Sequence, residues 1–177
     1  MMVKLITLSK GLITGLTMIA FSLFFFYGLN QPPESPLQYI IYGVFMLGII
    51  WTILSFSKKS GASLIFKDHF SAGFSTFIMV TLLMVLFTAI FYKLNPGLLE
   101  AKIALNNQLA LKEGNHTPDE ITANAKQMSS IFMPMMLAIT TIIYLFLGAL
   151  LSVVVSGMII QLKKYGNRPD NHYPSSK

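Results

Sequence analysis

The chain has 177 residues, of which 54% are apolar and only 11% are charged, against about 25% charged in a typical soluble domain. A soluble surface needs Lys, Arg, Asp and Glu to cover it, whereas a bilayer accepts Leu, Ile, Phe and Met directly. The low share of charged residues therefore excludes an ordinary soluble domain. The lack of cysteine excludes disulfides and cysteine sites. The net charge of +6 comes with a single arginine, so we expect no nucleic-acid partner.

Four long runs carry no charged residue, and each is close to the ~20 residues that a helix needs to cross a bilayer. The first run follows two lysines as a secretory signal does, but it is longer than a signal's apolar region and ends in aromatic residues, so we interpret it as a retained span. The sequence predicts an all-α fold, an integral membrane four-helix bundle in a single domain of residues 1–177. The predicted spans are residues 11–29, 37–56, 70–92 and 136–160.

The basic residues indicate an orientation, because loops rich in Lys and Arg stay in the cytoplasm. Two precede the first span, three lie between the second and third spans, and four follow the fourth span. The long loop before the fourth span has four basic residues, whose positive charge is compensated by four acidic residues. The loop between the first two spans has no basic residue. We expect a multi-pass protein of the bacterial inner membrane with both termini in the cytoplasm. Residues 165–177 are polar and broken by proline, which predicts a flexible tail.

Residues 96–130, between the third and fourth spans, form the one long polar stretch with a helical pattern. Leu98, Leu105 and Leu109 recur at helical spacing and predict a short amphipathic helix. A second helix is expected to start after Thr117, where a threonine, a proline and a glutamate three residues on match a capping box. The sequence thus predicts an extramembrane helical hairpin.

The second helix of this insert carries apolar residues at steps of four and three, and it is expected to continue into the fourth span with a kink near Pro134. The insert is the only ordered element that spanning the membrane does not require. We therefore expect it to contact a partner protein or the bilayer surface. The candidate contact residues are Leu98, Leu105, Leu109, Ile121 and Met128.

The predicted spans contain no Asp, Glu, Lys, Arg or His, although proton-coupled carriers usually place such groups at membrane depth. The three histidines lie in separate aqueous segments, and His69 beside Asp68 is interpreted as a solvated polar pair rather than an acid–base pair. Methionine clusters are typical of adaptable packing more than of a soft-metal site. We therefore expect no catalytic residue, no cofactor and no metal site, and hence no enzyme.

Small residues recur on two of the predicted spans. Such stripes let helix backbones approach closely, and serine can hydrogen-bond across helices. They favour packing within the chain, while a homo-oligomer or a membrane-protein partner remains the alternative. The stripe residues are Gly11, Gly15, Gly148, Ser152 and Ser156.

Three stretches resemble the domain of unknown function 4199 family, small bacterial membrane proteins mostly from Bacteroidota. They are FKDHFSAGF at 66–74, KLNPGLLEAK at 93–102 and TPDEITANAKQM at 117–128. The resemblance covers nearly all of the chain from Gly11 to Lys164. It implies four spans with a helical insert before the last one, and it brings no activity or catalytic residues.

Two classes of function are consistent with the sequence. The first is a non-enzymatic inner-membrane protein, a structural, assembly or partner-binding subunit that uses residues 96–130 as its contact surface. The alternative is a carrier or channel for a neutral or lipid-like solute, lined by hydroxyls and backbone carbonyls instead of charges.

Overall fold

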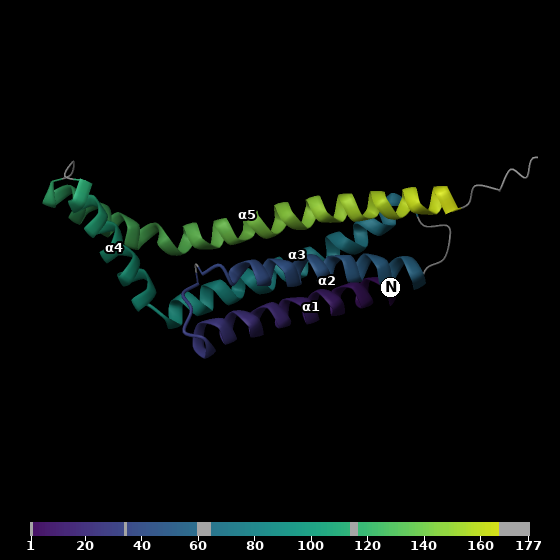
Figure 1. Cartoon of the computed structure of the whole chain (residues 1–177), viewed down its shortest axis with the longest axis horizontal. Coiled ribbons are helices and arrows are strands. Elements are labelled where there is room, and N and C mark those ends of the chain that lie inside the picture. Colours follow the sequence, from purple (N-terminus) through teal and green to yellow (C-terminus); the bar gives the residue numbers. More distant parts are fainter. Residues whose placement is uncertain (1, 34, 60–64, 114–116, 167–177) are drawn as a thin grey trace, which may run out of the picture.

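The computed structural model describes residues 2–33, 35–59, 65–113 and 117–166. These residues form helices joined by short connections, with no strand among them (Figure 1). The all-α fold class is therefore confirmed. In chain order the helices are α1 (Met2–Leu23), the π-helix η1 (Phe24–Gly28), α2 (Gln38–Lys59), α3 (Phe66–Leu94), α4 (Gly97–Glu113) and α5 (Pro118–Gly166).

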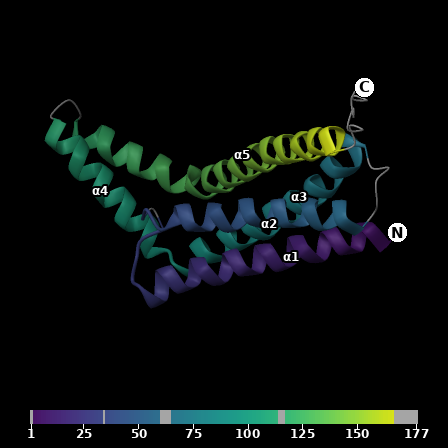
Figure 2. The ribbon, with the colours of Figure 1, turned by 45° about the vertical axis from the view of Figure 1, so that its right-hand side comes forward.

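The helix α3 is the centre of the bundle. It packs against α1, α2 and α5, and its most extensive contact is with α5. The long helices lie side by side, with the start of α1 and the end of α5 at one end and α4 at the other (Figures 1 and 2). We call these the terminus end and the insert end.

In the described part of the chain, four helices are long and apolar enough to cross a membrane. Their outward faces expose large apolar side chains, which water would disfavour and lipid accommodates. The chain is therefore a membrane protein with four apolar helices. Examples of these exposed residues are Leu82, Leu86, Ile142, Phe146 and Leu150.

The helix α5 has 49 residues, which at 1.5 Å per residue makes it about 73 Å long, more than twice the ~30 Å hydrocarbon core. The predicted capping box at its start is confirmed, since the backbone N–H of Glu120 donates to Thr117 Oγ1 at 3.3 Å and that of Thr117 donates to Glu120 Oε2 at 2.8 Å. Pro134 lies inside α5, which bends along its length (Figure 2). A proline removes one helical hydrogen bond and is a sufficient cause for such a bend.

Side chains tie the insert end of α3 to η1. The Asn95 amide donates to the carbonyl of Phe91 at 2.8 Å and caps α3, which ends at Leu94, two residues before Pro96. The same amide is 3.2 Å from the hydroxyl of Tyr27. Of the predicted tail, residues 165 and 166 belong to α5, and residues 167–177 lie outside the described part of the chain.

Candidate functional site

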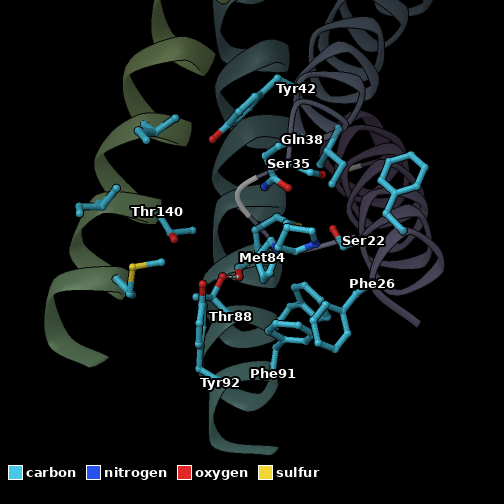
Figure 3. A pocket seen from close by; sticks show the side chains of 18 of the residues that line it. Ser22, Phe26, Ser35, Gln38, Tyr42, Met84, Thr88, Phe91, Tyr92 and Thr140 are labelled. Atoms are coloured by element: carbon cyan, nitrogen blue, oxygen red, sulfur yellow. Dashed lines mark hydrogen bonds between the residues drawn. The ribbon is translucent and has the colours of Figure 1, made fainter. Parts of the chain in front are cut away.

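A cavity of about 210 Å³ opens between the helices at the insert end. Its walls come from the end of α1 with η1, the turn before α2, the start of α2, the second half of α3 and the middle of α5 (Figure 3). The volume exceeds that of an engineered cavity of about 150 Å³ that binds benzene. It is therefore large enough for a small ligand or for part of a larger one.

The local sequence explains why the bundle does not close here. The run of aromatic residues after Leu23 forms a π-helix, in which the N–H of Leu29 donates to the carbonyl of Phe24 at 3.1 Å, five residues back. A π-turn holds one residue more than an α-turn and shifts the side chains around it. Beyond it, Pro32, Pro33 and Pro36 prevent the chain from continuing as a helix. The turn thus covers one side of the cavity without filling it.

The described lining is apolar and aromatic, with hydroxyl and amide groups among the rings. Tyr42 on α2 and Thr140 on α5 project into the space between α5 and α3 (Figure 3). Neither hydroxyl makes a hydrogen bond to another described residue, whereas Thr88 already donates to the carbonyl of Met84 at 2.8 Å. None of the described lining residues is charged. The polar ones are Ser22, Gln31, Ser35, Gln38, Tyr42, Thr88, Tyr92, Thr140 and Tyr144.

Aromatic pairs hold the cavity walls in place. Tyr144 packs with its ring centroid 5.7 Å from that of Tyr42 and 5.2 Å from that of Phe45, which joins α5 to α2 at the cavity wall. At the other wall, the rings of Phe26 and Phe91 are 4.9 Å apart and nearly perpendicular, which joins η1 to α3. Edge-to-face pairs of this kind add about 0.5–1.5 kcal/mol beyond their buried area. The cavity is therefore framed by well-packed elements.

A second polar site lies at the terminus end, between α3 and α5. His69 is fully buried there, and its ring meets that of Phe56 edge-on at 6.1 Å. Ser152 and Ser156 on α5 are also fully buried. Neither ring nitrogen of His69 and neither serine hydroxyl has a hydrogen-bond partner among the described residues.

The interpretation of His69 and Asp68 as a solvated polar pair is wrong for His69. The helix α3 begins at Phe66 rather than after His69, and it carries the imidazole into the interior of the bundle, against the ring of Phe56 on α2. Asp68 instead accepts a hydrogen bond from the backbone N–H of Ile65 at 3.1 Å and so caps the helix start. The helix α3 is therefore longer than the predicted span 70–92, and its first turn adds a buried ionisable residue outside that span.

The predicted small-residue stripes lie at helix contacts within the chain. A Cβ on Gly11 would meet Met79 at 3.0 Å, and a Cβ on Gly15 would meet Leu83 at 2.6 Å, so both face α3. On α5, a Cβ on Gly148 would meet the ring of Phe77 at 2.5 Å. Ser152 and Ser156 continue that face of α5.

The candidate contact residues of the insert do not share one environment. Ile121 is buried and Leu98 and Met128 are half-buried, where the start of α5 contacts α4. Leu105 and Leu109 are exposed, as is Leu111. The insert therefore has an inward set and an outward set of apolar side chains.

The sequence analysis did not identify the cavity or the buried histidine. The hydroxyl residues of the cavity are spread over several helices, and no short motif connects them. For His69 a signal was present, because Gly73 and Thr76 follow at helical spacing and extend the same face. In the described residues, no three His, Asp or Glu side chains are grouped to hold a metal ion.

The chain was compared with family models. The model described as "Protein of unknown function (DUF4199)" matches residues 10–160, most of the chain, and the chain therefore belongs to this family. No curated protein and no solved structure matches the chain.

Proposed function

We propose that this DUF4199 protein is a non-enzymatic membrane protein that binds a neutral, lipid-like molecule in the cavity at the insert end. The observation that supports this proposal is the combination of free hydroxyls and apolar walls, without a charge, in the described lining. It favours the carrier-like alternative from the sequence over a purely structural role. No arrangement of catalytic groups is needed for such binding.

The lining determines the chemistry of the ligand. Tyr42 and Thr140 can each donate and accept one hydrogen bond, which suits a hydroxyl, ester or ketone group. Ile139, Ile143 and Phe87 offer apolar surface to a hydrocarbon segment. A charged head group would be left unpaired among these residues, and burying an unpaired charge is costly. The ligand class is therefore a neutral amphiphile, with its polar group toward the hydroxyls.

We also propose the inner membrane as its location, with both termini in the cytoplasm. The distribution of basic residues supports this orientation. The insert end, and with it the cavity, then faces the outer leaflet. A neutral lipid of that leaflet can reach the cavity from the side, since the membrane itself supplies the ligand.

Native mass spectrometry tests the proposal. The protein is released from membranes that contain equal amounts of a diacylglycerol and a phosphatidylglycerol. We expect diacylglycerol adducts on the wild-type protein in preference to phosphatidylglycerol adducts. Thr140→Phe places a ring in the cavity and should reduce the diacylglycerol occupancy about tenfold, the effect of ~1.4 kcal/mol.

The matched control is Ile142→Phe, two residues away on the exposed face of α5. It adds a similar ring toward the lipid and should leave the occupancy unchanged. Equal adducts of both lipids on the wild-type protein, or equal loss in both variants, would show that the lipid binds the outer surface non-specifically.

A second candidate function is docking of a membrane-protein partner on α4. The observation in its favour is that Leu105, Leu109 and Leu111 are exposed on this helix. Leu105 and Leu109 lie one turn apart and so share a face. A partner that covers these residues would make the chain an assembly or partner-binding subunit, and a second copy of the chain would make it a homo-oligomer.

The double variant Leu105→Gln, Leu109→Gln tests this candidate. Proteins that co-purify in mild detergent are compared with those of the wild type, and the oligomeric state is measured by light scattering. Loss of a co-purifying protein supports a partner, and loss of a dimer supports self-association. Gln108→Ala, at an exposed polar position of the same helix, is the control. An unchanged set of proteins and an unchanged mass would exclude docking through this face.

A further inference from the structure

The contact between α3 and α5 at the terminus end contains the least satisfied polar groups of the described structure. Both ring nitrogens of His69 and the hydroxyls of Ser152 and Ser156 are buried without a partner. Leaving a buried polar group unpaired costs about 1–3 kcal/mol each. Such a group inside a membrane bundle persists mainly where it has a use.

The other buried hydroxyls nearby do not share this property. Thr52 donates to the carbonyl of Gly48 at 2.9 Å, and Thr81 donates to that of Phe77 at 2.8 Å. Thr76 donates to the carbonyl of Ala72 at 3.0 Å. Each of these hydroxyls has a carbonyl partner within its own helix, and that of Thr76 is also 3.4 Å from the carbonyl oxygen of Thr7 on α1. The two serines of α5 are different, because they keep their hydrogen-bonding capacity for a group across the interface.

The register of the two helices puts that group at His69. The hydroxyl of Ser152 lies against Gly73, where a Cβ would be 2.5 Å from its oxygen. The helices α3 and α5 run in opposite directions (Figure 1). Ser156, one turn after Ser152 on α5, therefore lies level with the residue one turn before Gly73 on α3. That level is the position of His69.

We propose that His69, Ser152 and Ser156 form a buried proton-binding site between α3 and α5. A protonated imidazole has two N–H donors and needs two acceptors, and the two serine oxygens supply them. A neutral imidazole has one donor and one acceptor, and a serine hydroxyl that rotates can donate to the latter. These atoms make no direct hydrogen bond to one another in the structure, but one bridging water can satisfy both protonation states.

The charges around the site come from two helices. Lys163 on α5 and Asp68 on α3 both act on His69 electrostatically, with opposite signs. The start of α3 adds a partial positive charge from its unpaired N–H groups. Burial of the ring, Lys163 and the helix start oppose protonation, while Asp68 and the serine oxygens favour it. This balance determines the pH at which the proton binds.

The described residues of α1 and α2, the other two helices at this end, include no carboxylate that could compensate the positive charge of a protonated His69. The α2 side chain that meets His69 is Phe56, and the exposed Lys58 follows it. On α1, the ammonium group of Lys10 lies 4.5 Å from the ring centroid of Trp51. Protonation of His69 therefore adds a positive charge to a largely basic end of the bundle, and the packing of α3 against α5 responds to pH.

Histidine NMR tests the site. His116→Gln with His172→Gln leaves His69 as the only one of three histidines, and the protein is labelled on its histidine ring. We expect a single titration of the His69 ring as the pH is lowered. Ser152→Ala with Ser156→Ala should move the midpoint toward acid by about one unit, since the protonated ring loses its acceptors.

The matched control is Ser129→Ala, at an exposed position of α5 far along the helix from the site. It should leave the midpoint unchanged. If the double serine variant does not fold, each single serine variant is titrated instead, with a shift of about half that size expected. A His69 ring that does not titrate, or a midpoint unaffected by every serine variant, would overturn the proposal and make His69 a packing residue.

Discussion

The Oγ atom of Ser152 lies 2.5 Å from the position that a Cβ atom on Gly73 would occupy. The same Cβ would be 2.9 Å from the Cδ1 atom of Ile53 on α2. Three helices therefore meet at a point where only glycine fits. This close approach brings the buried serines of α5 into the contact with α3, and it fixes the register on which the proton site depends.

Gly73→Ala should destabilise the bundle by about 1–3 kcal/mol, because the added methyl overpacks the α2–α3–α5 contact. The readout is the apparent melting temperature in detergent. Gly157→Ala is the control, since a Cβ there meets nothing within 4 Å. It should be neutral, or stabilising by up to about 1 kcal/mol through better helix propensity. Equal effects of the two changes would contradict the close contact.

Asn95→Ala should destabilise the protein by about 1–2 kcal/mol, because it removes the hydrogen bond that ends α3 and the contact with Tyr27. Tyr27→Phe removes the second contact alone and should cost less. A double-mutant cycle on the unfolding free energy separates the two contributions. Strictly additive effects would show that Asn95 and Tyr27 do not interact.

Thr117→Ala should loosen the first turn of α5 by about 0.5–2 kcal/mol, because Glu120 loses the acceptor of its backbone N–H. Hydrogen exchange in residues 119–124 should accelerate, while exchange in α3 stays unchanged. Ser129→Ala, further along the same helix, serves as the control. Faster exchange throughout α5 would show that the start of this helix does not open independently.

Thiol labelling tests the orientation, and the absence of cysteine from the chain makes it direct. Leu105→Cys on α4 and Lys58→Cys at the end of α2 place single thiols at exposed positions. With intact cells, a reagent that does not cross the membrane should label the first variant and not the second. The reverse result would invert the proposed topology.

The sequence predicted the membrane bundle because lack of charge over about 20 residues is a local property. It also predicted the capping box of α5, since Thr117 and Glu120 are close in the sequence. The burial of His69 was missed because Lys67 and Asp68 precede it, and charge alone placed the start of the span at 70. Only the burial of His69 against Phe56 of α2 shows that one side of this helical turn faces inward.

The cavity was not predictable in the same way. It depends on the π-helix η1 and on the distance between α5 and α2, and neither follows from the pattern of apolar residues. Tyr42 and Thr140 lie about a hundred residues apart in the sequence. Their joint role becomes visible only where the two helices face each other.

The most direct test of the central claim is photoaffinity labelling with a diacylglycerol that carries a diazirine near its glycerol group, followed by mapping of the labelled peptides. The account predicts labels on the cavity wall of α2 and α5, around Tyr42 and Thr140, and their loss in Thr140→Phe but not in Ile142→Phe. Labels confined to the outward faces of the helices, around Leu86 and Phe146, would contradict it.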